Sequence, residues 1–198
     1  MVSDEVLTQQ VTRGNLSAFE ELVERYKKLI FTIVYRIIGH YQEAEDITQE
    51  VFLTVFEKLY QFDSGKKFKP WIQRIAINTT ITALRKKQKV INISYDENLE
   101  KDFNLNASSK IPDPQTEVEK QELQAEINSA LQGLNDGYRI ILVMRYQMDL
   151  NNSEISDILN VSREIVEVRL HRARKALRKS VVEKWTARGL KDELPAIL

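Results

Sequence analysis

Residues 154–178 have the sequence EISDILNVSREIVEVRLHRARKALR, and this stretch decides the fold class. Ser153 can cap a short helix, Asn160 suits a left-handed turn, and Ser162 can cap a second helix. In that second helix, apolar residues at steps of four, three and four form one seam: Val166, Leu170, Ala173 and Leu177. A short helix, a tight turn and a helix with a basic outer face can place side chains in the major groove. We therefore predict a DNA-binding helix-turn-helix in preference to a merely solvated amphipathic helix.

Helical periodicity extends over most of the chain on both sides of this motif. Toward the N-terminus it predicts helices over residues 15–39 and 42–59, and a third that begins near Pro70. Ser17 and Glu20 can form a capping box for the first of these helices, and Gly39 can end it. Helical patterning resumes over residues 117–134 and 138–146.

A polar, acidic stretch separates the two helical parts. Residues 92–116 are rich in Asp, Glu, Asn and Ser and contain Pro112 and Pro114, which is typical of a linker. Residues 90–93 include a β-branched run that is a weak strand candidate. The sequence predicts an all-α protein of two small helical domains, residues 1–91 and 117–185, joined by a flexible linker, with a C-terminal tail over residues 186–198.

The chain has no net charge, yet its basic residues are concentrated in two segments. Residues 66–89 hold eight Lys or Arg and no acid, and residues 161–180 hold seven against Glu164 and Glu167. Both segments are predicted to bind a polyanion. Phe62, Phe68 and Trp71 lie among the first cations, where aromatic faces could stack on unpaired bases. For Phe68 and Trp71, burial in the core is the favoured alternative.

Composition and missing motifs exclude most catalytic classes. The chain has no cysteine and two histidines, so it offers no disulfide and no thiolate metal site. No phosphate-binding glycine loop, HExxH motif or long apolar run is present, and the acidic start is unlike a signal peptide. We expect a cytoplasmic protein without cofactor, metal or catalysis. The enzymatic alternative is a helical nuclease or other phosphoryl-transfer enzyme that holds Mg²⁺ on the acids Glu43, Glu45, Asp46 and Glu50, of which Asp46 and Glu50 are four apart. The sequence has no second acidic cluster of convincing spacing to complete such a site.

Four segments together resemble the bacterial RNA polymerase sigma factors of the extracytoplasmic-function (ECF) group. They are EAEDITQEVF at 43–52, FKPWIQRIAIN at 68–78, LNDGYRIILVMRY at 134–146, and the helix-turn-helix at 154–178. The resemblance implies a sigma-2 domain that opens the minus-ten element and a sigma-4 domain that recognises the minus-thirty-five element. It also implies core RNA polymerase, promoter DNA in duplex and single-stranded form, and an anti-sigma factor as partners, with the linker in the RNA channel of the polymerase.

The same resemblance assigns site residues by position. Asp46, Gln49 and Glu50 match the positions that dock on polymerase in the family. The alternative interpretation is an ordinary solvated acidic face. By the same resemblance, a loop that captures a flipped base consists of Asp63, Ser64, Gly65 and Lys66. The following helix is expected to contact the promoter through Lys69, Arg74, Asn78, Arg85 and Lys86. Recognition of the minus-thirty-five element falls to Ser162, Arg163, Glu164, Glu167, Arg169 and Arg172.

The chain departs from the family pattern at several positions. Asn135 stands where the family has Pro, Asn160 where it has Gly, and Thr82 near a usual acid. Glu164 and Glu167 bring carboxylates into the recognition helix, where they repel phosphate but can accept a hydrogen bond from cytosine. The competing function is a stand-alone helix-turn-helix regulator, which would leave the basic segment 66–89 unused.

Overall fold

The computed structural model describes residues 2–87 and 117–187, and every regular element in these two ranges is helical. The helices are α1 (Asp4–Thr12), α2 (Leu16–Ile38), α3 (Tyr41–Lys58), α4 (Phe68–Lys87), α5 (Glu117–Gln132), α6 (Asp136–Leu142), α7 (Asn152–Leu159) and α8 (Arg163–Ala187). A 3₁₀ turn (Leu59–Gln61) follows α3, and a π-helical turn (Val143–Gln147) follows α6. The predicted all-α fold is confirmed. The strand candidate at 90–93, the linker 92–116 and residues 188–198 of the tail lie outside the described residues.

The predicted N-cap of α2 was wrong by two residues, whereas its predicted end was correct. Asn15, not Ser17, is the N-cap, because its side-chain oxygen accepts a hydrogen bond from the Ala18 amide at 3.3 Å. Gly39 ends the helix in the left-handed conformation, with φ of 77°, which a residue without Cβ adopts at little cost.

In the helix-turn-helix, the predicted N-cap of the first helix was wrong, whereas the predicted turn residue and the predicted N-cap of the second helix were correct. The N-cap of α7 is Asn151 rather than Ser153, and it forms a capping box with Glu154. Asn160 occupies the left-handed turn, with φ of 53°, as predicted. The Ser162 hydroxyl accepts a hydrogen bond from the Ile165 amide at 3.4 Å and caps α8. The turn geometry of the motif therefore follows from two predicted residues, Asn160 and Ser162.

Helices α1 to α4 enclose an N-terminal core. Its fully buried side chains include Leu22 and Ile30 of α2, Val51 of α3, and Phe68 and Ile72 of α4. Leu7 and Val11 attach α1 to the same cluster. Burial of one such aliphatic or aromatic side chain contributes roughly 1.5–3 kcal/mol relative to exposure. The α1 to α4 unit thus has a hydrophobic core of its own.

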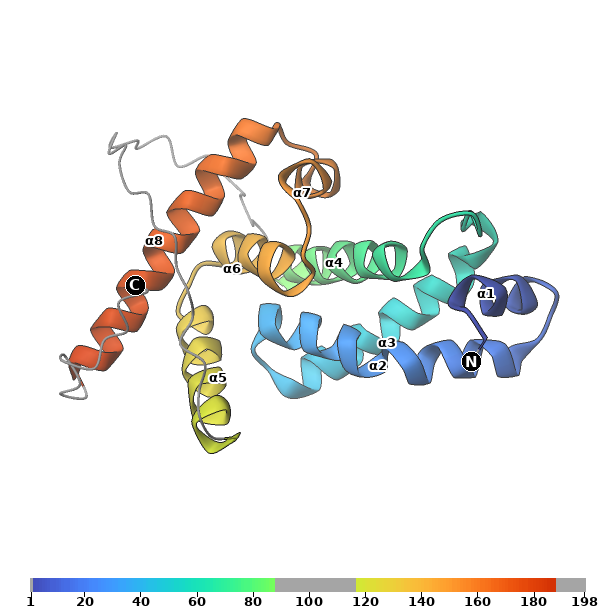
Figure 1. Ribbon diagram of the computed structural model, residues 1–198, viewed down its shortest axis with the longest axis horizontal. Coiled ribbons are helices and arrows are strands. Elements are labelled where there is room, and N and C mark those ends of the chain that lie inside the picture. Colours follow the sequence, from blue (N-terminus) through green and yellow to red (C-terminus); the bar gives the residue numbers. More distant parts are fainter. Residues whose placement is uncertain (1, 88–116, 188–198) are drawn as a thin grey trace.

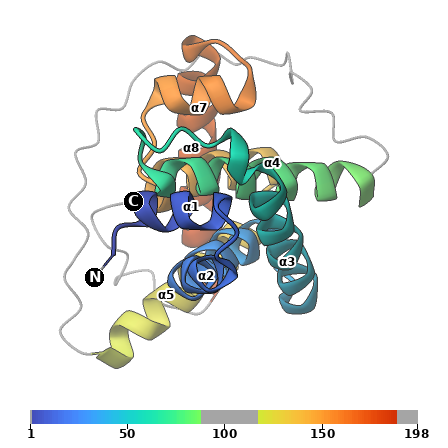
Figure 2. The same ribbon diagram turned by 90° about the vertical axis from the view of Figure 1, so that its right-hand side faces the viewer.

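A second cluster, which we call the shared core, joins the two predicted domains. Ile33 and Ile37 of α2 and Ile77, Ile81 and Leu84 of α4 pack in it. The C-terminal part contributes residues from four helices and their connections: Leu131, Leu134, Ile140, Ile141, Leu142, Val143, Met144, Met148, Leu150, Ile155, Val166, Leu170 and Ala173. Figure 1 shows α6 at the end of α4 with α2 below both, Figure 2 also shows α2 below α4, and α2 contacts α5, α6 and the π-helical turn directly. The sequence predicted two tethered domains, and the structure packs them against each other.

Candidate nucleic-acid interface

The three residues predicted to dock on polymerase lie on one exposed face of α3. Asp46, Gln49 and Glu50 all point away from the inward stripe of Ala44, Ile47, Val51 and Val55. The same face continues toward the C-terminus of α3 with Leu53, Phe56 and then Tyr60, which are exposed by 64%, 46% and 75%. The sequence analysis missed this apolar continuation, although the three-residue and four-residue spacing of the side chains could have revealed it.

The loop predicted to capture a base is an ordered turn. The Asp63 carboxylate accepts from the Gly65 amide at 3.0 Å, and the Lys66 amide donates to the Asp63 carbonyl at 2.9 Å. Asp63, Gly65 and Lys66 are exposed, and Ser64 is half-buried. An Asx turn of this kind fixes the backbone without any buried side chain. Its carbonyls, amides and hydroxyl are therefore held at the surface beside the first turn of α4.

Helix α1 supports this loop at both ends, which the sequence analysis did not predict. The Gln9 side-chain amide donates to the Ser64 hydroxyl at 3.1 Å. The Glu5 carboxylate accepts from the Phe68 amide, the first residue of α4, at 3.4 Å. The pKa of Glu5 is lowered, first by its own backbone amide and then by the Phe68 amide and Lys67. Glu5 therefore acts as an N-terminal cap for a helix that lies 63 residues away in the sequence.

Helix α4 presents one outward row of polar and basic residues. Arg74, Asn78, Arg85 and Lys86 are exposed and share that row with Thr82, and Lys69 is exposed in the first turn. Between residues 66 and 87 no exposed residue is acidic. Lys87, the last residue of α4, forms an ion pair with Glu43 of α3 at 2.7 Å.

The aromatic residues near this row belong to the core rather than to a stacking surface. Phe68 is fully buried, and its ring centroid lies 5.5 Å from that of Phe62 and 5.7 Å from that of Trp71. Phe62 and Trp71 are half-buried and pack on the N-terminal core. The favoured alternative of core packing is thus confirmed for Phe68.

The helix-turn-helix turns its predicted seam inward and most of its predicted contacts outward. Val166, Leu170 and Ala173 are buried, and Leu177 is partly buried. Ser162, Arg163, Glu164 and Glu167 are exposed, and Arg169 and Arg172 are half-exposed. The Arg163 guanidinium donates to the Ser153 hydroxyl at 2.9 Å, which ties α8 to α7. The structure therefore brings the predicted residues together at the N-terminal half of α8.

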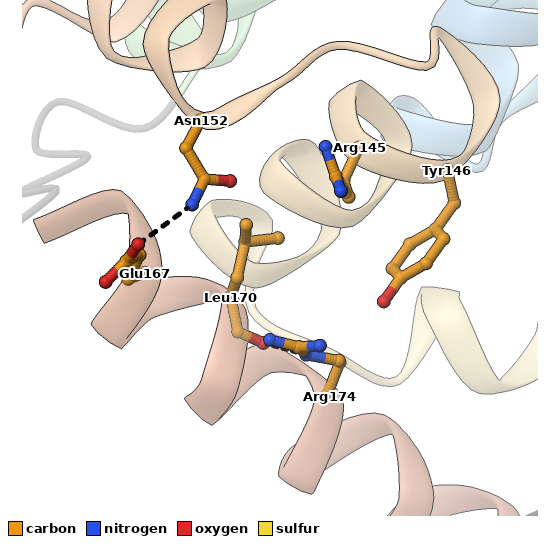
Figure 3. Close-up of a pocket in the computed structure, with 6 residues that line it drawn as sticks. All are labelled: Arg145, Tyr146, Asn152, Glu167, Leu170 and Arg174. Carbon is orange, nitrogen blue, oxygen red and sulfur yellow. Dashed lines mark hydrogen bonds between the residues drawn. The ribbon is translucent and has the colours of Figure 1, made fainter. Parts of the chain in front are cut away.

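The two carboxylates of the recognition helix are both held by neighbours. The pKa of Glu164 is lowered, first by a hydrogen bond from the Ser162 hydroxyl and then by its own backbone amide. The Asn152 side chain of α7 donates to Glu167 at 3.3 Å. Figure 3 shows this pair at the edge of a pocket of about 320 Å³, lined also by Arg145, Tyr146, Leu170 and Arg174. Glu167 is thus oriented at the surface by a partner on the neighbouring helix.

Two further expectations concern metals and membranes. In the described ranges, no group of three or more His, Asp or Glu side chains is arranged to hold a metal ion, so the Asp46 and Glu50 pair gains no further ligands there. Across residues 2–87 and 117–187, no helix combines the length and apolarity needed to cross a bilayer.

Comparison with protein families identifies both halves of the chain. The sigma-70 region 2 family matches residues 22–90, and the sigma-70 region 4 family matches residues 124–177. These matches contain the exposed face of α3 with Asp46, Gln49 and Glu50 (the α3 face) and the loop of residues 63–66 (the capture loop). They also contain the outward row of α4 from Arg74 to Lys86 (the α4 row) and the helix-turn-helix. Helix α1 lies outside the matched residues, although Gln9 contacts the loop and Glu5 contacts the start of α4.

Individual relatives agree with these matches. The ECF RNA polymerase sigma factor SigW of Bacillus subtilis is 36% identical over 177 residues, which cover 87% of this chain and 94% of SigW. The ECF RNA polymerase sigma-E factor of Escherichia coli K12 is 27% identical, over 89% of this chain and 93% of the relative. The structure of CnrH in complex with the cytosolic domain of CnrY matches the fold with a TM-score of 0.59 at 23% identity, over 89% of this chain and 95% of the solved one. The sigma factor RpoE in complex with the anti-sigma factor NepR from Bartonella quintana matches it with a TM-score of 0.57 at 16% identity, over 82% of this chain and 96% of the solved one.

The two family matches, the relative that spans nearly the whole chain, and the placement of the predicted contact residues on exposed faces agree with one another. The chain belongs to the extracytoplasmic-function group of RNA polymerase sigma factors and is a sigma initiation factor with a region 2 domain and a region 4 domain.

Proposed function

We propose that this chain binds core RNA polymerase through the α3 face, opens the minus-ten element with the capture loop and the α4 row, and recognises the minus-thirty-five element with α8. The observation that carries the proposal is the outward surface of residues 66–87, where every exposed residue is basic or neutral. Like charges concentrated on one face repel one another unless an anion screens them. Residues 1–91 form the polymerase and minus-ten domain in this proposal, and residues 117–185 form the minus-thirty-five domain.

Strand opening in this proposal uses binding energy and no catalysis. Extrusion of one base from a duplex costs a few kcal/mol, so several contacts must act together. The loop of Asp63 to Lys66 offers small polar groups for the rim of a base pocket, and Lys69 and Arg74 stand nearby for the displaced backbone. Binding to polymerase supplies the remaining contacts, which is why isolated sigma factor is expected to open DNA poorly.

Recognition of the minus-thirty-five element should depend on Glu167. Its carboxylate, oriented by Asn152, can accept a hydrogen bond from the amino group of cytosine in the major groove. A good contact to a base edge contributes about 1–3 kcal/mol of discrimination. Selection of duplex sequences by the wild-type protein and by Glu167→Gln should therefore give different preferences at one position, and identical preferences would remove Glu167 from the set of reading residues.

A sigma factor and a stand-alone regulator differ in their need for polymerase. Purified core enzyme plus this chain should give promoter-specific run-off transcripts from supercoiled genomic templates, whereas a regulator would bind duplex DNA tightly without core enzyme. Absence of both transcripts and a complex with core enzyme in gel filtration would refute the sigma function.

An anti-sigma factor is a further expected partner, because the two solved structures named above are both complexes of such a fold with another protein. The site of action in this proposal is the cytoplasm, where promoters are transcribed.

A further inference from the structure

The outer face of α8 carries an apolar side chain among its predicted base-reading residues. Val168 is 44% exposed. It stands two residues after Val166 and two residues before Leu170, and both of these are buried. Two residues of an α-helix correspond to a rotation of about 200°. Val168 therefore points away from the core side of α8 and lies near the middle of its outer face.

Val168 lies in the part of α8 that approaches base edges in a helix-turn-helix. It is the sixth residue of the helix, which begins at Arg163. The N-terminal residues of a recognition helix contact bases in the major groove. Figures 1 and 2 both show the start of α8 beside α7. The hydrogen bonds from Arg163 to Ser153 and from Asn152 to Glu167 hold the two helices together at this point.

The side chains around Val168 on this face are charged or polar. Glu164 and Arg172 lie about one helical turn before and after it, and His171 lies three residues further on. Among the described residues, Val168 belongs to neither hydrophobic cluster and is not packed against one. A β-branched side chain also has a slightly lower helix propensity than most unbranched ones. Within the folded chain, a valine here therefore adds no core packing to offset that cost.

An apolar side chain in the major groove can recognise one feature of DNA, the C5 methyl group of thymine. Valine has two methyl groups and no hydrogen-bonding atom in its side chain, so it gains little from a phosphate or from a base edge without a methyl group. The side chain is also short, so it reaches a base only where the helix backbone lies deep in the groove. The N-terminal half of a recognition helix meets that condition.

We propose that Val168 is a specificity-determining residue that packs against the C5 methyl group of one thymine in the minus-thirty-five element. This inference rests on the proposed function of α8 as the reader of that element. Glu167 and Val168 then recognise different chemical groups, the amino group of a cytosine and the methyl group of a thymine. An apolar contact releases no counterions, so its contribution to binding should not depend on salt, unlike that of a phosphate contact.

Replacement of thymine by deoxyuridine tests the contact, because it removes the C5 methyl group and keeps the hydrogen-bonding atoms of the base. Holoenzyme reconstituted from core polymerase and the full chain would first select duplexes from a library randomised over the minus-thirty-five element. Each thymine of the selected sequence would then be replaced in turn. At one position the wild-type holoenzyme should lose affinity by about fourfold, the factor expected for burial of one methyl group. The loss should be equal at two salt concentrations.

Val168→Ala completes a double-mutant cycle with this base substitution. The variant should bind the thymine duplex about fourfold more weakly than the wild type. It should bind the thymine and deoxyuridine duplexes equally, because the γ-methyl groups that reach the base are gone. Val168→Thr keeps one of these methyl groups and should retain part of the discrimination. Val6→Ala is the matched control, since Val6 of α1 is 43% exposed and its loss should leave the discrimination unchanged.

The proposal is overturned if no thymine of the selected sequence shows a methyl dependence with the wild-type protein, or if Val168→Ala keeps the full discrimination. Circular dichroism should show unchanged helix content in each variant, because alanine is a better helix former than valine. Failure of the proposed function has a different result, since the holoenzyme would then select no sequence over the minus-thirty-five element. The present inference would be lost together with it.

Discussion

Replacement of Phe68 by alanine tests whether the first turn of α4 belongs to the core or to a DNA-stacking surface. Phe68 has no exposed surface, and its ring lies against Tyr26, Phe62 and Trp71 at centroid distances of 5.3, 5.5 and 5.7 Å. Truncation of a buried phenylalanine costs about 3–5 kcal/mol, because apolar contacts are lost and a cavity remains. Aromatic pairs add roughly 0.5–1.5 kcal/mol each beyond the buried area. We expect Phe68→Ala to lower the free energy of unfolding by about 4 kcal/mol.

Phe56→Ala is the control for this measurement, because Phe56 is 46% exposed and contacts one ring, Phe19, at 5.0 Å. Its truncation should cost less than about 1.5 kcal/mol, since only part of its surface is buried. Urea denaturation followed by circular dichroism gives both values. The core assignment would be refuted if Phe68→Ala cost no more stability than Phe56→Ala while it abolished binding of a minus-ten single strand.

Three further predictions concern the α1 support and the α3 face. Gln9→Ala should slow promoter opening, measured with a fluorescent base in the minus-ten element, and leave duplex binding by the helix-turn-helix unchanged, because it frees only Ser64; an equal loss of both would contradict a local role. Glu5 has a lowered pKa, so its stabilising contribution should be complete above pH 4.5 and should disappear as the pH falls through its folded-state pKa. The stability difference between wild type and Glu5→Gln should therefore shrink as the pH is lowered below 4.5, and a constant difference would exclude this linkage. Asp46→Ala should weaken association with core polymerase in gel filtration without a change in isolated DNA binding.

The sequence predicted most of the helices and two of their left-handed turn residues, but it missed α1 and two of the N-caps. Gly39 and Asn160 were identified because few residues adopt a positive φ easily. Ser17 and Ser153 were wrong as caps because Asn15 and Asn151 are equally suitable and lie two positions away. Hydrophobic periodicity locates a helix end only to within a few residues, so it could not decide between such neighbours.

The packing of the two domains against each other could not be predicted, because its polar contacts have no local signature. Arg139 looks like an ordinary surface charge in the sequence, but it is nearly buried, and its guanidinium donates a hydrogen bond to the carbonyl of Ile37, 102 residues earlier. The same holds for Glu5, whose partner amide belongs to another helix. Contacts of this kind depend on the tertiary fold, and periodicity or charge patterning along the chain does not report them.

Helix α4 belongs to two cores at once, and this restricts how the protein can evolve. Phe68 and Ile72 are committed to the N-terminal core, and Ile77 and Ile81 to the shared core. A substitution on either buried face therefore disturbs packing with a neighbour. Only the exposed side chains of α4, most of which lie in the row of Arg74, Asn78, Thr82, Arg85 and Lys86, can vary without such a penalty. Under the proposed function, divergence of minus-ten preference among descendants of this gene should be concentrated in that row and in the adjoining loop.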